Sequence, residues 1–263
     1  MKVVDHRELV QRMDTETRLD ELYVERSVQL KASSVAKRWL VASSIPRDCR
    51  IFSDIFGQCA NQIDAGKQWF SRELAAESVD ATALGWVETE DGQSVSEVRL
   101  YVQRWERLVE KLNAGVVGPI ELYKGLKVSD YQRGLTEDQY LCYPNLAIES
   151  IRAQMLKIGG EWTSTVINWL MRLPNMSSEL LRYCEIQGSG GRKSWLVTLH
   201  KYPVTNDQWL TLAEVLSVQT GYDVNRYNDG NESLVHVSGG LTNDREDYVN
   251  LYFESSRQRL IAA

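Results

Sequence analysis

The chain has 263 residues, of which 43% are hydrophobic, so it can bury a sizeable core as one large domain or two modest ones. The 30 Lys and Arg residues against 36 Asp and Glu residues give a net charge of −6, which excludes a general electrostatic attraction to nucleic acid or anionic lipid. Charges within the first five residues and the lack of any run of 18 apolar residues argue against a signal peptide and a membrane span. We therefore expect a cytoplasmic protein, or one in a particle assembled in the cytoplasm, with no membrane partner.

Apolar residues recur at helical spacing from residue 5 to about residue 185, which predicts six to eight helices. The clearest pattern covers residues 94–115, where Ser94 and Glu97 form a capping box before an apolar stripe. The other predicted helices cover residues 8–13, 19–42, 51–77, 137–143, 146–158 and 161–173.

The period of the apolar pattern changes from 3.6 to 2 in the last third of the chain. Residues 194–201 predict a strand, and residues 207–220 predict a helix that a capping box of Thr205 and Gln208 begins. Three further short strands are predicted over 222–227, 233–237 and 248–253. The expected fold is therefore mainly α: a multi-helix domain over residues 1–187 and a small α+β domain (strand-helix-strand-strand-strand) over residues 188–263.

The boundary between these domains is placed at the glycine-rich stretch GSGGRKSW, residues 188–195. A phosphate-binding P-loop needs a glycine directly before its lysine and lies between a strand and the helix that follows. Here Arg192 precedes Lys193, and a predicted helix precedes the loop while a strand follows. The stretch is therefore interpreted as a hinge.

The residues that usually carry chemistry form no complete motif. The cysteines Cys49, Cys59, Cys142 and Cys184 are scattered without the spacing of zinc ligands, which predicts free thiols. There are three histidines, and the sequence alone leaves open whether one of them lies beside Cys184. We expect no catalytic site, metal or cofactor.

The predicted strands of the small domain carry one polar face. Strand alternation turns Val197, Val237 and Val249 toward the predicted helix 207–220 and turns other residues away from it. Such a face can bind a peptide, single-stranded nucleic acid or a second copy of the protein, and it can also be merely solvated or covered. The residues of this candidate binding face are Thr198, His200, His236, Asn250 and Tyr252.

A second candidate site is the basic run 26–47, which contains no Asp or Glu. In a chain of net negative charge this run suggests an acidic partner, either nucleic acid or an acidic surface of another subunit, although a solvated helix face is the alternative. Its cations are Arg26, Lys31, Lys37, Arg38 and Arg47.

Three functions are compatible with these features. The favoured one is a non-enzymatic structural or assembly protein, such as a component of a virus particle or large complex, which associates with itself or with other protein subunits. The lack of a catalytic motif and the eight tryptophans support it. The alternatives are a nucleic-acid-binding module that uses the run 26–47, and an enzyme with a dispersed site around His200 and His236, helped by Tyr252 or Cys184. Taken together, these features favour a protein that is not an enzyme.

Overall fold

Many strands of this chain have one apolar and one polar face. In β5 (Ser94–Gln103), Val98, Leu100 and Val102 are fully buried against helices, whereas Arg99 and Tyr101 point to the other side. Because successive side chains of a strand alternate between faces, such strands build a sheet that helices cover on one side only.

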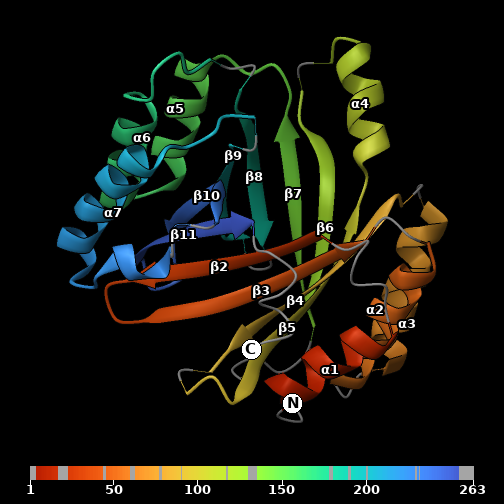
Figure 1. The fold of residues 1–263 in the computed structure, drawn as a ribbon. Helices are drawn as coiled ribbons and strands as arrows, with labels where there is room; N and C mark the ends of the chain where they lie inside the picture. Colours follow the sequence, from red (N-terminus) through yellow and green to blue (C-terminus); the bar gives the residue numbers. More distant parts are fainter. Residues whose placement is uncertain are drawn as a thin grey trace.

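The computed structural model describes residues 4–16, 23–43, 46–59, 63–76, 79–89, 91–116, 118–129, 135–177, 180–188, 191–199, 201–228, 230 and 232–254. In this part of the chain, ten antiparallel strands close into a barrel (Figure 1). They follow the order β5-β4-β3-β2-β11-β10-β9-β8-β7-β6, and pairing between β5 and β6 closes the ring, so that the barrel has no free edge. The strands are β1 (Val4–Asp5), which pairs with the start of β5, and β2 (Tyr23–Lys31), β3 (Val35–Ser43), β4 (Ala81–Glu88), β5, β6 (Ile120–Ser129), β7 (Thr136–Tyr143), β8 (Arg182–Gly188), β9 (Lys193–Thr198), β10 (Ser233–Leu241) and β11 (Asp247–Glu254).

Helices surround the barrel (Figure 1). They are α1 (His6–Glu16), α2 (Pro46–Cys59), α3 (Ile63–Ala76), α4 (Trp105–Asn113), α5 (Ile148–Ile158), α6 (Glu161–Leu170), α7 (Asn206–Thr220) and the 3-10 helix η3 (Val224–Tyr227). None of the described helices is long and apolar enough to cross a membrane.

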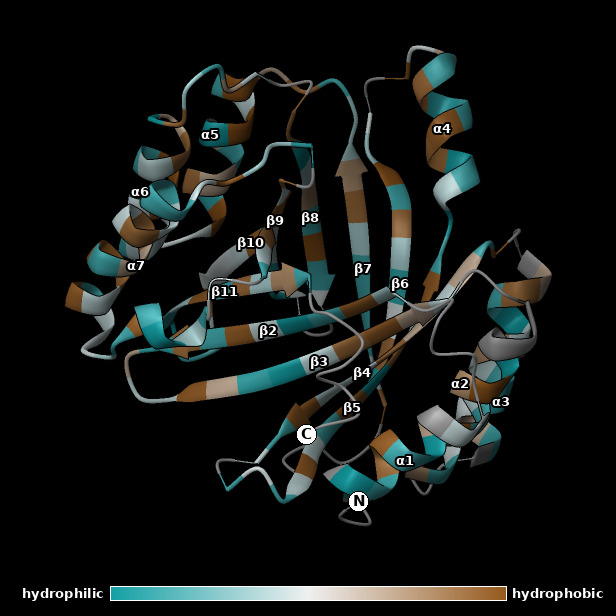
Figure 2. Cartoon of the chain, viewed as in Figure 1, coloured by the Kyte–Doolittle hydropathy of each residue, from teal (hydrophilic) through white to brown (hydrophobic). Residues whose placement is uncertain are grey.

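The main apolar core lies between the barrel and the helices. One cluster joins β9 to β11 with α5, α6 and α7 and includes Trp195, Trp209 and Phe253. A second cluster joins β3 to β5 with α1, α2 and α3 and includes Phe56 and Trp86. Figure 2 shows hydrophobic and hydrophilic residues alternating along the barrel strands. Because the apolar faces are turned outward to the helices, the inward faces are left for polar side chains.

The prediction of a mainly α fold is wrong, because several stretches with helical spacing form strands. The helix predicted over 19–42 is instead the hairpin of β2 and β3, and the one predicted over 137–143 is β7. In β5, the apparent capping box of Ser94 and Glu97 lies within the strand. Apolar residues at helical spacing coincide there with the strand alternation of Val98, Leu100 and Val102, and the closure of the barrel decides between the two patterns.

Other predicted elements are confirmed. The helices predicted over 146–158, 161–173 and 207–220 correspond to α5, α6 and α7. The capping box of α7 is present: the Gln208 N–H donates to Thr205 Oγ1 (3.4 Å), and the Thr205 N–H donates to Gln208 Oε1 (2.8 Å). The strand predicted over 222–227 is instead largely the 3-10 helix η3.

The predicted domain boundary between residues 187 and 188 falls at the end of β8. Strand β8 pairs with β9 across this point, and β11 pairs with β2. Strands from both sides of the boundary therefore belong to the same barrel.

Candidate functional site

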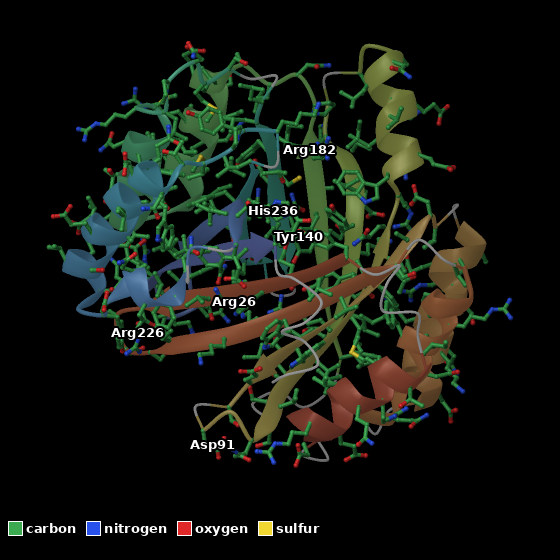
Figure 3. The ribbon with its side chains drawn as sticks, viewed as in Figure 1. Arg26, Asp91, Tyr140, Arg182, Arg226 and His236 are labelled. Carbon is green, nitrogen blue, oxygen red and sulfur yellow. The ribbon has the colours of Figure 1, made fainter. Side chains whose placement is uncertain are left out.

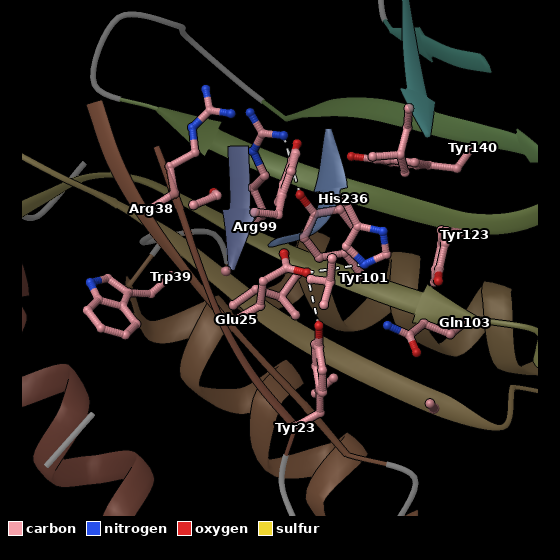
Figure 4. Close-up of a pocket in the computed structure, with 18 of the residues that line it drawn as sticks. Tyr23, Glu25, Arg38, Trp39, Arg99, Tyr101, Gln103, Tyr123, Tyr140 and His236 are labelled. Atoms are coloured by element: carbon pink, nitrogen blue, oxygen red, sulfur yellow. Dashed lines mark hydrogen bonds and ion pairs between the residues drawn. The ribbon is translucent and has the colours of Figure 1, made fainter. Parts of the chain in front are cut away.

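The inward side chains of the barrel enclose a cavity of about 470 Å³ (Figure 4). This volume is typical of sites for small molecules. Side chains of different chemistry line different parts of the wall: Figure 4 shows Arg38 and Arg99 side by side, Glu25 and His236 in the centre, and Tyr123 and Tyr140 on the side away from Arg38.

Arg38 on β3 faces into the cavity. Its guanidinium donates to Gln29 Oε1 (2.7 Å) and to Asn250 Oδ1 (3.2 Å), which are both neutral amide oxygens. Its Nε is buried and has no hydrogen-bond partner among the described residues. Arg38 thus presents a positive charge and an unused donor in the barrel interior.

Arg99 on β5 lies near Arg38 and forms part of an ionic cluster. It pairs with Glu97 and donates to the hydroxyl of Tyr101 (3.3 Å). Asp138 Oδ2 lies 3.8 Å from Arg99 Nη1 and 3.9 Å from Lys127 Nζ. Burial lowers the pKa of Lys127, and the positive charge of Arg99 lowers it further.

This cationic end has a surplus of positive charge. Burial alone would raise the pKa of Glu97, but the nearby arginines hold it below its ordinary value, so this carboxylate is ionised. Arg38, Arg99, Lys127 and Arg192, which lies 3.8 Å from Asp138, then provide four positive charges against two negative charges of Glu97 and Asp138. The surplus suits an anionic ligand.

Aromatic rings line one side of the cavity. Tyr140 contacts Tyr101 and Tyr123 edge-to-face, with ring centroids 6.0 and 5.6 Å apart, and Trp105 contacts Tyr123 in the same way at 5.5 Å. Burial raises the pKa of Tyr123 and Tyr140 well above its ordinary value, so both rings remain neutral phenols. Their faces can attract a cation.

A carboxyl group and a histidine lie near the centre of the cavity, next to Tyr101 (Figure 4). The Tyr23 hydroxyl donates to Glu25 Oε2 (3.2 Å), and His236 Nε2 lies 3.4 Å from the same oxygen. His236 Nδ1 lies 2.9 Å from Thr198 Oγ1. Burial raises the pKa of Glu25 to about 8; the hydrogen bond from Tyr23 acts in the opposite direction, and Glu254 raises the pKa further. A carboxyl group with such a pKa can accept a proton near neutral pH.

The described residues contain no group of three or more His, Cys, Asp and Glu side chains that could hold a metal ion. Chemically, the cavity offers an anion-binding end, an aromatic side that suits a cationic or planar apolar group, and a proton acceptor. These are the requirements of a reaction in which an anionic group leaves and a proton is lost from an aromatic ring.

The structure places most of the predicted polar sheet face inside the barrel. His236 meets Thr198 as described above, and its ring lies edge-on to that of Tyr252 at 5.9 Å (Figure 3 shows His236 and Tyr140). Asn250 donates to Ser238 Oγ (2.6 Å). His200 lies outside the described residues. The face is enclosed by the other strands, and its role in binding stays a prediction.

The basic run 26–47 does not form one surface. Arg38 points into the barrel, whereas Arg26 lies outside it, bonded to Glu232 and stacked over the Phe253 ring at 4.9 Å. Lys37 is exposed on β3, and Lys31 is partly exposed at the end of β2. The side chain of Arg47 lies outside the described residues. Lys31 and Arg38 lie on the two strands of one hairpin rather than on a helix face.

Sequence reasoning missed most of the cavity wall. Glu25, Arg99, Tyr101, Tyr123 and Tyr140 all lie in stretches that were assigned to helices or left unassigned. The available signal was the alternation of polar and apolar residues within 94–103. Arg99, Tyr101 and Gln103, which alternate with Val98, Leu100 and Val102, are the residues that line the cavity.

Glycine at position 125 makes room for Tyr101. A Cβ atom at Gly125 would lie 2.8 Å from the Tyr101 ring. We expect Gly125→Ala to displace this ring, to weaken its contacts with Tyr140 and Arg99, and to reduce the free energy of unfolding by about 1–3 kcal/mol. Urea unfolding measures this change.

Gly118→Ala is the matched control, because a Cβ atom there meets nothing within 4 Å. We expect it to change stability by less than about 0.5 kcal/mol. Equal effects of the two substitutions would show that Tyr101 does not need the space at position 125.

No protein-family model matches the sequence, and no curated protein matches it. Solved structures share the fold. The 5-dimethylallyltryptophan synthase of Streptomyces coelicolor aligns over 89% of this chain and 81% of its own, with a TM-score of 0.60 and 14% identity. The 6-dimethylallyltryptophan synthase of Micromonospora olivasterospora aligns over 88% of this chain and 81% of its own, with a TM-score of 0.57 and 14% identity. AnaPT of Neosartorya fischeri aligns over 88% of this chain and 77% of its own, with a TM-score of 0.54 and 11% identity. At these identities the likeness establishes the fold.

This likeness overturns the prediction of a non-enzymatic structural or assembly protein. The solved structures that share the barrel include synthases and the NotF prenyltransferase, not components of a virus particle, and the prediction that the protein is not an enzyme is wrong for the same reason. The alternative of a nucleic-acid module also loses its basis, since the cations of the run 26–47 lie on different faces. Self-association and association with other protein subunits stay predictions.

Proposed function

We propose that the protein is an aromatic prenyltransferase, which transfers a dimethylallyl group from its diphosphate to a ring carbon of an indole-containing acceptor inside the barrel. The observation that carries this proposal is that one cavity brings together two arginines, a group of tyrosines, and the carboxyl group of Glu25 beside His236. The Streptomyces coelicolor enzyme, whose barrel resembles this one, has been solved in complex with DMASPP and Trp.

The arginine end suits the diphosphate. Arg38 is held by amide oxygens rather than by a carboxylate, so its charge is free to face a ligand, and Arg99 lies beside it. Guanidinium groups bind phosphate oxygens through paired hydrogen bonds. As the bond between the allylic carbon and the diphosphate oxygen breaks, the electron pair leaves with the diphosphate, and these cations stabilise the added charge.

The tyrosine faces suit the dimethylallyl group. Breaking the bond leaves positive charge on the allylic carbons, and the rings of Tyr101, Tyr123 and Tyr140 can stabilise it through their π-electrons. The strands hydrogen-bond to one another all round the barrel, so the wall limits the access of water that would otherwise capture the cation.

The carboxyl group of Glu25 suits the acceptor. A carbon–carbon bond forms between the aromatic ring and the allylic carbon, and the attacked ring carbon then loses its proton to the ionised carboxylate of Glu25. Tyr23 and His236 hold this carboxylate by their contacts with Oε2, and Thr198 positions the imidazole. The products are the prenylated acceptor and diphosphate, so atoms and charges balance.

Incubation with dimethylallyl diphosphate and either tryptophan or tryptophan-containing dipeptides tests the proposal. We expect mass spectrometry to find a product heavier than the acceptor by one C5H8 unit, together with released diphosphate. Arg99→Gln should abolish product formation, whereas Lys37→Gln, on the outer face of the same barrel, should not. Absence of product with every indole acceptor, despite binding of the diphosphate, would overturn the proposal.

A further inference from the structure

Two cysteines lie directly opposite each other on neighbouring strands of the barrel. Cys142 on β7 is the register partner of Cys184 on β8, and both residues are fully buried within the same apolar cluster. Both carry free thiols, and the thiols form a hydrogen bond. The proposed transfer reaction uses neither of them.

The geometry is compatible with a disulfide. Opposite residues of antiparallel strands have Cα atoms about 4.5–5.5 Å apart, and disulfides join Cα atoms about 4.4–6.8 Å apart. Because the two residues already face each other in register, a bond between their sulfur atoms requires side-chain rotation rather than a change of strand register.

The two thiols differ in access. A second cavity of about 240 Å³, next to α4 and the end of β7, has Cys142 in its wall, together with Leu108 and Arg182. Cys184 does not line that cavity. A small molecule that enters this space therefore reaches Cys142 first.

The two thiols also differ in acidity. The hydrogen bond from Cys184 lowers the pKa of Cys142, and the positive charge of Arg182 lowers it further against the effect of burial. The same hydrogen bond, together with burial, raises the pKa of Cys184. The positive charge of Arg182 favours the thiolate in this pair, and the thiolate is the reactive form, so access selects Cys142 as the thiol that reacts first.

We propose that Cys142 and Cys184 form a redox-active pair, in which hydrogen peroxide oxidises Cys142 and Cys184 then closes a disulfide between β7 and β8. In the first step the Cys142 sulfur attacks a peroxide oxygen, the O–O bond breaks, water leaves with the thiol proton, and Cys142 becomes a sulfenic acid. In the second step the Cys184 sulfur attacks the sulfenic sulfur, the S–O bond breaks, and a second water leaves with the Cys184 proton. Two thiols and one peroxide thus give one disulfide and two waters.

The disulfide would act on the proposed active site, and this part of the inference rests on the proposed function. Tyr140, in the aromatic wall, is two residues before Cys142 on the same face of β7. Arg182, two residues before Cys184, stacks over Trp105, whose ring contacts Tyr123 (Figure 3 shows Arg182 and Tyr140). Rotation of the two cysteine side chains into a disulfide changes the packing of this wall, so we expect prenyl transfer to fall several-fold in the oxidised protein.

Peptide mapping of the full chain tests the pair without any assay of activity. The protein is treated with one equivalent of hydrogen peroxide, its free thiols are alkylated, and the digest is analysed by mass spectrometry. We expect a linked pair of peptides containing Cys142 and Cys184, which dithiothreitol separates. Cys59 is the internal control: burial raises its pKa to about 11, so it should stay a free thiol.

Two variants separate the roles of the cysteines. In Cys184→Ser, we expect dimedone to trap a sulfenic acid at Cys142; in Cys142→Ser, we expect Cys184 to stay a thiol. The wild-type measurement needs neither variant, so a variant that fails to fold leaves the test intact. Free thiols at both positions after peroxide treatment, or oxidation of Cys59 at the same rate as Cys142, would overturn the pair.

The expected effect on prenyl transfer can be refuted independently of the disulfide itself. A disulfide that forms without changing prenyl transfer would overturn the effect on the active site and leave the cysteine pair standing. A disulfide that forms in a protein with no prenyl transfer in either state would overturn the proposed function alone.

Discussion

Glu25→Gln is expected to lower kcat/KM for prenyl transfer by ~10²–10⁴-fold, the usual contribution of a general base. Glutamine keeps the size of the side chain and an acceptor oxygen for the Tyr23 hydroxyl, but it cannot take the proton from the ring carbon. Steady-state kinetics with dimethylallyl diphosphate and the best acceptor measure the change. Wild-type values of kcat/KM in this variant would remove Glu25 from the reaction.

The pH profile separates this chemical role from a structural one. Because burial raises the pKa of Glu25 to about 8, the ionised form that accepts a proton increases as the pH rises toward and past 8, so wild-type kcat/KM should increase over that range. Glu25→Gln should lose this rise. In Glu254→Gln the rise should begin at a lower pH, because the charge of Glu254 contributes to the raised pKa of Glu25.

Glu73→Ala is expected to reduce the free energy of unfolding by about 3–5 kcal/mol, which is the usual cost of leaving one member of a buried ion pair without its partner. Glu73 on α3 is almost fully buried, and its Oε2 accepts hydrogen bonds from Arg104 and Lys124, at 3.1 Å each. Arg104 is equally buried at the start of α4, so the loss of Glu73 removes one of the carboxylates that balance its buried charge, while Glu121 stays 3.3 Å from its Nη1. Urea or thermal unfolding measures the effect.

Glu137→Ala is the matched control, because its ion pair with Arg72 is exposed on both sides. Pairs of this kind contribute about 0–1 kcal/mol, so this variant should remain close to the wild-type stability.

The contribution of Glu73 to stability should also depend on pH. Hydrogen bonds from Lys124 and Arg104 outweigh burial and hold the pKa of Glu73 below its ordinary value, so its contribution is present above that value and is lost as the pH falls. Equal stability of the two variants at neutral pH would contradict the role of the buried pair.

Helices with local signals were predictable from the sequence. Residues 207–220 have a capping box at Thr205 and a glycine in the left-handed conformation at Gly221, and both act within a few residues of the helix ends. β5 was not predictable in the same way, because Val98 and Val102 are compatible with either period. The outcome depends on pairing with β4 and β6, which the periodicity of residues 94–103 alone does not reveal.

The candidate site was predictable only in part, for the same reason. His236, Thr198 and Tyr252 share one face by local alternation, and the sequence placed them together. Glu25 reaches His236 only because β11 pairs with β2, which brings residues from the two ends of the chain side by side. An ordinary alternation test within single strands cannot find such a pair, since it says nothing about which strands become neighbours.

The central claim is that one cavity in the barrel interior holds a prenyl diphosphate at Arg38 and Arg99 and an aromatic acceptor beside Glu25. A crystal structure of the protein with tryptophan and the unreactive thiolo analogue of dimethylallyl diphosphate tests it most directly. We predict diphosphate oxygens within hydrogen-bonding distance of Arg38 and Arg99, and the indole ring beside Glu25. Diphosphate bound outside the barrel, or beside Glu25, would contradict the account.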